Sequence, residues 1–233
     1  MEFLRLLLVG PFPDNGRKLM PALERQREHL QTVWSNSSVA TFGIERLFRL
    51  YLVLVAYLFP GIYIRHVAGK FGVIGRKISL DVYVTLKILF PIGCLYFGFQ
   101  NNAVIQFLVL YFAFETLMYV AGLLFLSDIY RPPISQKRSY LLFMMNYVEI
   151  TLAFSVIYSG RHLLSRMIGG MDAVYFSFVT GFTIGYGDVT PIDFSGKILV
   201  IVQSLCSLFF VTLAISKAVG SFDQNTAKPA NNK

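Results

Sequence analysis

Long apolar segments dominate this chain and restrict the folds that it can adopt. There are five of them, at residues 47–64, 82–99, 104–126, 140–158 and 196–219. Each approaches the length of about 20 apolar residues that an α-helix needs to cross a bilayer. Only 15% of the residues are charged and 55% are hydrophobic, a composition that excludes most water-soluble folds. The sequence therefore predicts an all-α membrane protein with up to five spans.

The N-terminal part of the chain, residues 1–43, is expected not to cross the membrane. Its apolar run at residues 3–9 is too short, and residues 19–34 predict a helix that lies at the membrane interface or in water. The first apolar segment contains Arg49 near its start and a Pro-Gly pair near its end, and both are unfavourable inside a span. We expect this segment to cross fully, which places the N-terminus outside. The alternative is a segment that lies flat or dips and returns, with the N-terminus in the cytoplasm.

Between the fourth and fifth apolar segments, residues 171–191 have the sequence MDAVYFSFVTGFTIGYGDVTP. Asp172 is a favourable N-cap for a short helix over residues 173–182. The C-terminal end of such a helix carries a partial negative charge, which favours a cation just beyond it. That end is followed directly by residues 183–188, which we call the TIGYGD loop.

To coordinate a bare cation, successive backbone carbonyls must all point at one axis, and the TIGYGD loop contains residues that allow this. Neither a helix nor a strand does this, because the backbone has to alternate its handedness from one residue to the next. Gly185 and Gly187 reach positive φ without a steric penalty. Ile184 and Tyr186 are then expected to turn their side chains away from the axis. A chance Gly-Tyr-Gly turn is the alternative, but such a turn needs neither the preceding helix nor the flanking apolar segments.

The loop and the helix before it resemble the pore loop and selectivity filter of potassium channels. In that family, backbone carbonyls replace the hydration shell of the ion. The resemblance implies that the filter is supported by Gly187, by Asp188 at its outer mouth, and by Tyr175 in the pore helix. The residues expected to coordinate K+ through their carbonyl oxygens are Thr183, which also contributes its hydroxyl, Ile184, Gly185 and Tyr186.

The chain also departs from the pattern of that family. Tyr175 and Phe176 stand where many relatives have tryptophans that pack around the filter, and we expect Tyr175 to donate a hydrogen bond to Asp188. Val179 stands where some relatives have a glutamate behind the filter. The common hinge glycine of the inner helix falls on Ser207, which makes this serine the candidate bending point.

Two interpretations of Ser207 remain open. Its hydroxyl can bond back to the carbonyl of Gln203, four residues earlier, and bend the helix mildly. Alternatively, the small residues Ser204, Cys206 and Ser207 form only a packing seam that lets neighbouring helices approach closely.

The resemblance also implies an architecture. Residues 140–158 and 196–219 look like the outer and inner pore helices around a re-entrant pore helix and filter, preceded by about three further hydrophobic helices. One filter per chain implies a homotetramer formed with three further copies. The expected domains are a non-spanning N-terminal segment at 1–43, membrane helices without a voltage-sensor pattern at 44–139, a potassium-channel pore domain at 140–219 and a short cytoplasmic tail at 220–233.

The distribution of basic residues predicts the orientation in the membrane. Residues 65–81 and 127–139 carry clusters of Lys and Arg, whereas the turn at residues 100–102 carries no charge. Basic loops stay in the cytoplasm, so the pore loop is expected to enter from outside and the C-terminus to be cytoplasmic. The net charge of +8 follows from these loops, and no basic-aromatic patch indicates a nucleic-acid partner.

A voltage sensor needs a basic residue at every third position of one span. Arg46 and Arg49 begin such a spacing, but Leu52 and Val55 end it. We therefore expect no voltage sensor of the usual kind.

Three charged residues, Lys87, Glu115 and Glu149, lie inside apolar segments. Such charges are costly in a membrane and face a partner or water. Lys87 and Glu115 are candidates for an ion pair across a helical hairpin, acting as a sensor or, as we favour, as a packing contact. Cys94 and Cys206 both lie in apolar segments and indicate small buried side chains rather than a disulfide or a metal pair.

These observations predict a multi-pass protein of the cell membrane that is embedded in the lipid bilayer and conducts K+ passively. The alternative is a non-conducting or regulatory subunit that acts only in a hetero-tetramer, to which it contributes its loop. The sequence contains no HExxH, GxSxG, GxxxxGK or CxxC motif, so we expect neither an enzyme nor a cofactor. In this interpretation K+ passes through the protein as the permeant ion and is not a cofactor.

Overall fold

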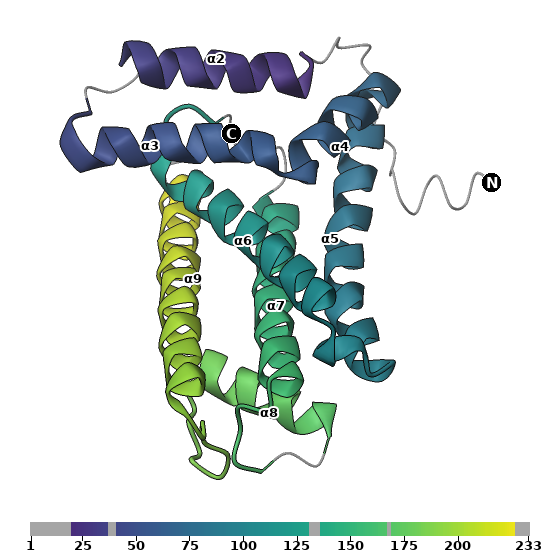
Figure 1. Ribbon diagram of the computed structural model, residues 1–233. Coiled ribbons are helices and arrows are strands. Elements are labelled where there is room, and N and C mark those ends of the chain that lie inside the picture. Colours follow the sequence, from purple (N-terminus) through teal and green to yellow (C-terminus); the bar gives the residue numbers. More distant parts are fainter. Residues whose placement is uncertain (1–19, 37–40, 131–135, 167–168, 227–233) are drawn as a thin grey trace, which may run out of the picture. The chain divides into compact units, whose positions relative to one another are not determined.

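The computed structural model describes residues 20–36, 41–130, 136–166 and 169–226. In these ranges the protein consists of α-helices joined by turns and short 3-10 helices, without any β-strand (Figure 1). The α-helices are α2 (Ala22–Ser35), α3 (Gly43–Val55), α4 (Pro60–Ala68), α5 (Gly72–Tyr96), α6 (Ala103–Phe125), α7 (Gln136–Gly160), α8 (Gly170–Gly181) and α9 (Phe194–Thr226).

Four helical stretches of the described chain are long and apolar enough to cross a membrane. This confirms the expected all-α membrane protein, with a short helix, α8, between its last two long ones. The four stretches are Pro60–Tyr96, Ala103–Phe125, Gln136–Gly160 and Phe194–Ser216.

The chain forms two compact units. Among the described residues, the first unit contains those up to Phe90 and those of Leu110–Glu149, and the second contains Pro91–Val109 and those from Ile150 onward. The second unit therefore holds the C-terminal half of α7, all of α8 and α9, and the TIGYGD loop.

The first apolar segment does not form the single spanning helix that we expected. α3 ends at Val55, a 3-10 turn follows, and Phe59 is extended, with φ −101° and ψ 143°. Pro60 then occupies the first turn of α4. A proline keeps the residue before it out of the helical region, so the break at Phe59 follows from the sequence. α3 alone, with 13 residues, is ~20 Å long, well short of the ~30 Å of a bilayer core.

α2 and α3 run side by side in Figure 1 and are joined by hydrogen bonds. The Gln26 side-chain amide donates to the carbonyl of Val53 at 2.8 Å, and Arg46 donates to the carbonyl of Trp34 at 3.0 Å. The predicted helix at residues 19–34 is therefore present as α2, and it packs against the same protein rather than standing alone.

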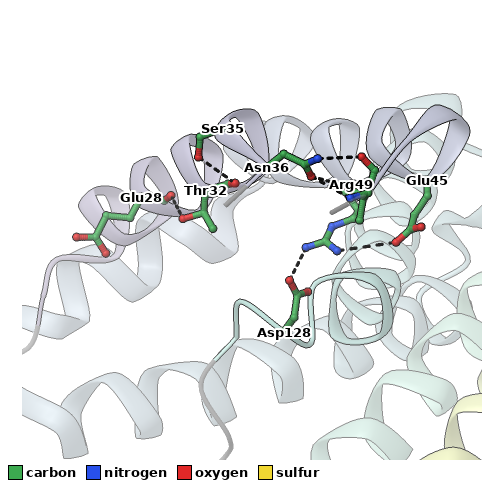
Figure 2. A network of polar contacts seen from close by, with 8 residues as sticks. Glu28, Thr32, Ser35, Asn36, Glu45, Arg49 and Asp128 are labelled. Carbon is green, nitrogen blue, oxygen red and sulfur yellow. Dashed lines mark hydrogen bonds and ion pairs between the residues drawn. The ribbon is translucent and has the colours of Figure 1, made fainter. Parts of the chain in front are cut away.

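Arg49, which interrupts the first apolar segment, is buried in the first unit. Figure 2 shows its guanidinium between Asp128, at 2.6 Å, and Glu45, at 3.9 Å. The arginine is therefore compensated by carboxylates, which explains why a charged residue is tolerated in an apolar helix.

Lys87 and Glu115 form the predicted ion pair, and Glu149 joins it. The Lys87 ammonium lies 3.5 Å from Glu115 Oε2 and 3.3 Å from Glu149 Oε1. It also donates a hydrogen bond to the hydroxyl of Thr116, and this hydroxyl donates to Glu149 Oε2 at 2.6 Å. We call these four residues the charge cluster. All four are buried.

Candidate functional site

The candidate site lies in the second unit and begins with α8. This helix begins at Gly170, earlier than the predicted residue 173, so the expectation that Asp172 is the N-cap is wrong. Asp172 instead occupies the third position of the helix, and its carboxylate accepts a hydrogen bond from the backbone N–H of Gly169 at 3.0 Å. A carboxylate in the first turn still satisfies a free N–H and complements the helix dipole.

The TIGYGD loop alternates the handedness of its backbone. Thr183, Gly185 and Gly187 have φ values of 57°, 61° and 78°, whereas the residues between them have negative φ. The two glycines adopt the positive φ that we expected. Thr183 was not expected to do so, because a β-branched residue at positive φ is strained. Successive peptide groups of this loop therefore do not follow the hydrogen-bonding pattern of a helix or a strand.

The backbone N–H groups at the start of the loop bond back to the end of α8. The N–H of Thr183 donates to the carbonyl of Thr180 at 3.0 Å, and the N–H groups of Ile184 and Gly185 donate to the carbonyl of Val179 at 2.9 and 3.3 Å. Among the described residues, no group donates a hydrogen bond to the carbonyls of residues 183–186. These oxygens are therefore free to bind a ligand.

The free carbonyls follow directly on the C-terminal end of α8, where the helix dipole is negative. Both features favour a cation. The side chains of Ile184 and Tyr186, which are 53% and 68% exposed, are large apolar or aromatic groups that a single chain leaves uncovered. One chain supplies one row of oxygens, so a closed ring around an ion requires further copies of the loop.

The outer end of the loop is tied to α8 through Tyr175. Its hydroxyl donates a hydrogen bond to Asp188 Oδ2 at 2.9 Å, as we expected from the sequence. Its ring also stacks on that of Tyr186, with 6.5 Å between the ring centroids and 6° between the planes. Tyr175 therefore contacts two residues of the TIGYGD loop at once.

The chain beyond the loop is fastened to the turn that follows α7. The N–H of Ser165 donates to the carbonyl of Thr190, and the N–H of Ile192 donates to the carbonyl of Leu163, both at 2.9 Å. The loop is therefore held at its start by α8 and at its end by this turn.

A buried polar network behind α8 was not predicted. Gln203 of α9 donates to the carbonyl and to the hydroxyl oxygen of Ser177, at 2.7 and 2.9 Å, and accepts a hydrogen bond from the hydroxyl of Tyr158 at 2.9 Å. Ser177 in turn donates to the carbonyl of Thr151 at 2.6 Å. The network joins α7, α8 and α9. A glutamine in the middle of the last apolar segment was the signal that could have revealed it, because polar groups in a span need partners.

Replacing Gln203 with methionine should lower the free energy of unfolding by roughly 1–3 kcal/mol, because it leaves the buried hydroxyls of Tyr158 and Ser177 with fewer partners. Thermal unfolding of the purified protein in detergent measures the change. Thr212→Val is the control, because this exposed hydroxyl bonds only to the carbonyl of Leu208 in its own helix. Equal melting temperatures for the two variants would contradict the importance of the network.

Ser207 does not form the hydrogen bond that the first of its two interpretations invokes. Its side chain is buried, and no bond joins its hydroxyl to the carbonyl of Gln203. The hydroxyl that bonds back within α9 is that of Thr212. α9 continues through Ser207 without interruption, so a bending point at this residue stays a prediction.

Comparison with known families identifies the region that contains this site. Residues 141–223 match a family model described as "Ion channel". The match supports an ion channel domain. This domain covers α8, the TIGYGD loop and most of α7 and α9, and it favours a membrane transport protein over an enzyme. No curated protein and no solved structure matches the chain.

Proposed function

We propose that the chain is a subunit of a potassium-selective channel that conducts K+ passively through a homotetrameric pore. The observation that carries this proposal is the backbone of the TIGYGD loop, whose φ values alternate in sign and whose carbonyls accept no hydrogen bond among the described residues. In the proposed pore, the carbonyls of Thr183, Ile184, Gly185 and Tyr186 and the hydroxyl of Thr183 coordinate K+. Asp188 adds its charge at the outer mouth.

A homotetramer is supported by the uncovered apolar surface of the ion channel domain. One face of α9 carries a row of exposed large apolar side chains that reaches over most of its described length. Other copies of this helix and the lipid bilayer are both suitable neighbours for such a face. The row consists of Ile198, Ile201, Val202, Leu205, Leu208, Val211 and Ile215.

The proposed orientation places the TIGYGD loop on the outer side and the C-terminus in the cytoplasm. It is supported by the basic residues before and within the N-terminal ends of α5 and α7, which are expected in the cytoplasm. Transport follows the electrochemical gradient, because the proposed filter needs no energy source.

Purified protein in liposomes should pass K+ faster than Na+ by more than about tenfold, a difference of ~1.4 kcal/mol in the barrier. The measurement is ion flux down matched gradients of the two ions, and empty liposomes are the control. Equal fluxes of K+ and Na+ would contradict the selectivity. Intact tetramers without any flux would contradict conduction and favour a regulatory subunit that acts in a hetero-tetramer.

A further inference from the structure

Three arginines of the first unit form no ion pair with any described carboxylate. They are Arg25 on α2, Arg65 on α4 and Arg76 on α5, and we call them the arginine cluster. The ion pairs found in this unit join other residues, namely Arg49 with Asp128 and Glu45, Lys87 with Glu115 and Glu149, and Arg138 with Asp81.

Arg76 is the member of the cluster on which the positive charges of the other two, Arg25 and Arg65, act. His29 adds no further positive charge beside them, since burial together with the charge of Arg25 lowers its pKa and favours its neutral form. Gathering like charges is unfavourable unless an anion lies between them. The arginine cluster therefore has the charge and the chemistry of an anion site.

A cavity adjoins one member of the cluster, Arg65. It has a volume of about 120 Å³ and is lined by Arg65, whose guanidinium also lies 5.0 Å from the ring centroid of Tyr119. Nε of Arg65 is buried and has no hydrogen-bond partner. Most of the other walls are apolar, including those contributed by Leu52, Val55, Phe59, Ile62, Met118 and Leu142.

One carboxylate, that of Glu115, also lines the cavity, but its charge is already compensated. It accepts hydrogen bonds from the Tyr83 hydroxyl at 2.5 Å and from the backbone N–H of Gly61 at 3.0 Å, and it pairs with Lys87. It therefore leaves the guanidinium of Arg65 available to a ligand.

We propose that the arginine cluster binds the phosphate headgroup of an anionic phospholipid, with an apolar part of the lipid in the adjoining cavity. Guanidinium groups bind phosphate oxygens in pairs of parallel hydrogen bonds. The cavity approaches the size of one of ~150 Å³ that binds benzene, so it accommodates a short apolar group. Anionic lipids are concentrated in the cytoplasmic leaflet, where the basic segments of this unit are expected to lie.

The outer face of α3 supports a lipid rather than a soluble ligand. Four large side chains on this helix recur at the spacing of one helical face and are exposed in the first unit. A short helix with such a face, beside basic residues, is typical of an element that lies in the membrane interface. The four residues are Ile44, Leu47, Tyr51 and Leu54.

The test measures lipid binding to the purified full-length chain in detergent, by native mass spectrometry. Short-chain phosphatidic acid should bind at least about tenfold more tightly than phosphatidylcholine of the same chain length. Arg65→Gln and Arg25→Gln should each weaken phosphatidic acid binding about tenfold, and Arg65→Lys should weaken it less. Arg27→Gln is the matched control, because Arg27 is exposed on the same helix and should leave affinity within about twofold of the parent.

Equal affinity for the two lipids, or parent-like binding by both glutamine variants, would overturn the proposal. Inorganic phosphate should compete with phosphatidic acid only at much higher concentration. Should inorganic phosphate bind in an Arg65-dependent way while phosphatidic acid does not bind, the lipid assignment is wrong and the ligand is a soluble phosphate. The binding measurement needs no ion conduction, so its outcome is independent of the proposed channel function.

Discussion

Replacing Gly185 with alanine should abolish potassium flux without preventing insertion of the chain into the membrane. Gly185 has φ +61°, and a Cβ added there meets no atom of the same chain within 4 Å. The effect therefore arises from backbone strain and not from a clash within the subunit. A side chain in this region costs ~1–2 kcal/mol, and in the proposed tetramer the cost applies in all four copies. Liposome flux of K+ measures the result.

Gly93→Ala is the matched control for this experiment. Gly93 lies within α5, and a Cβ there also meets nothing within 4 Å, but its φ is not positive. This variant should conduct like the parent. Normal K+ flux through the Gly185→Ala variant would show that the TIGYGD loop is not the filter.

Replacing Lys87 with methionine should destabilise the protein by about 3–5 kcal/mol. The change leaves Glu115 and Glu149 buried near each other without their shared cation, and an uncompensated buried charge costs energies of this size. Thermal unfolding of purified protein in detergent should show a large drop in melting temperature.

Adding Glu149→Gln to the Lys87→Met variant tests whether the charge cluster explains the loss. The double variant removes one of the two carboxylates and should recover part of the lost stability. If the double variant is as unstable as the sum of the two single variants, the charges do not interact as the structure indicates.

The sequence predicted the backbone conformation of the TIGYGD loop better than the contacts that hold this loop in place. Gly185 and Gly187 were identified from their conformational freedom, and both have positive φ. The bond between Tyr175 and Asp188 was also predicted, because Tyr175 stands where many members of the potassium channel family have a tryptophan that bonds the aspartate of this loop. The buried partners of Gln203 were not predicted, since they lie on α7 and α8 and their approach depends on tertiary packing.

Elsewhere, predictions from local sequence patterns were incomplete where contacts with another helix determine the structure. The pair of Lys87 and Glu115 was predicted from a helical hairpin, but Glu149 joins it from α7, whose depth relative to the hairpin is not encoded in any local pattern. The hydropathy of residues 47–64 predicted a single spanning helix. The proline at the start of α4 breaks this stretch, and the buried pair of Arg49 and Asp128 holds α3 in the first unit.

One turn of α7 belongs to two sets of contacts. Glu149 accepts the hydrogen bond of Thr116 in the first unit, and two residues later the carbonyl of Thr151 accepts the hydrogen bond of Ser177, on α8, in the second. Two helical residues are separated by only ~3 Å along the axis, and a helical turn moves as a rigid piece. This single turn of α7 therefore carries both a carboxylate of the charge cluster and the carbonyl to which α8 is bonded, so a substitution that distorts the turn alters both sets of contacts.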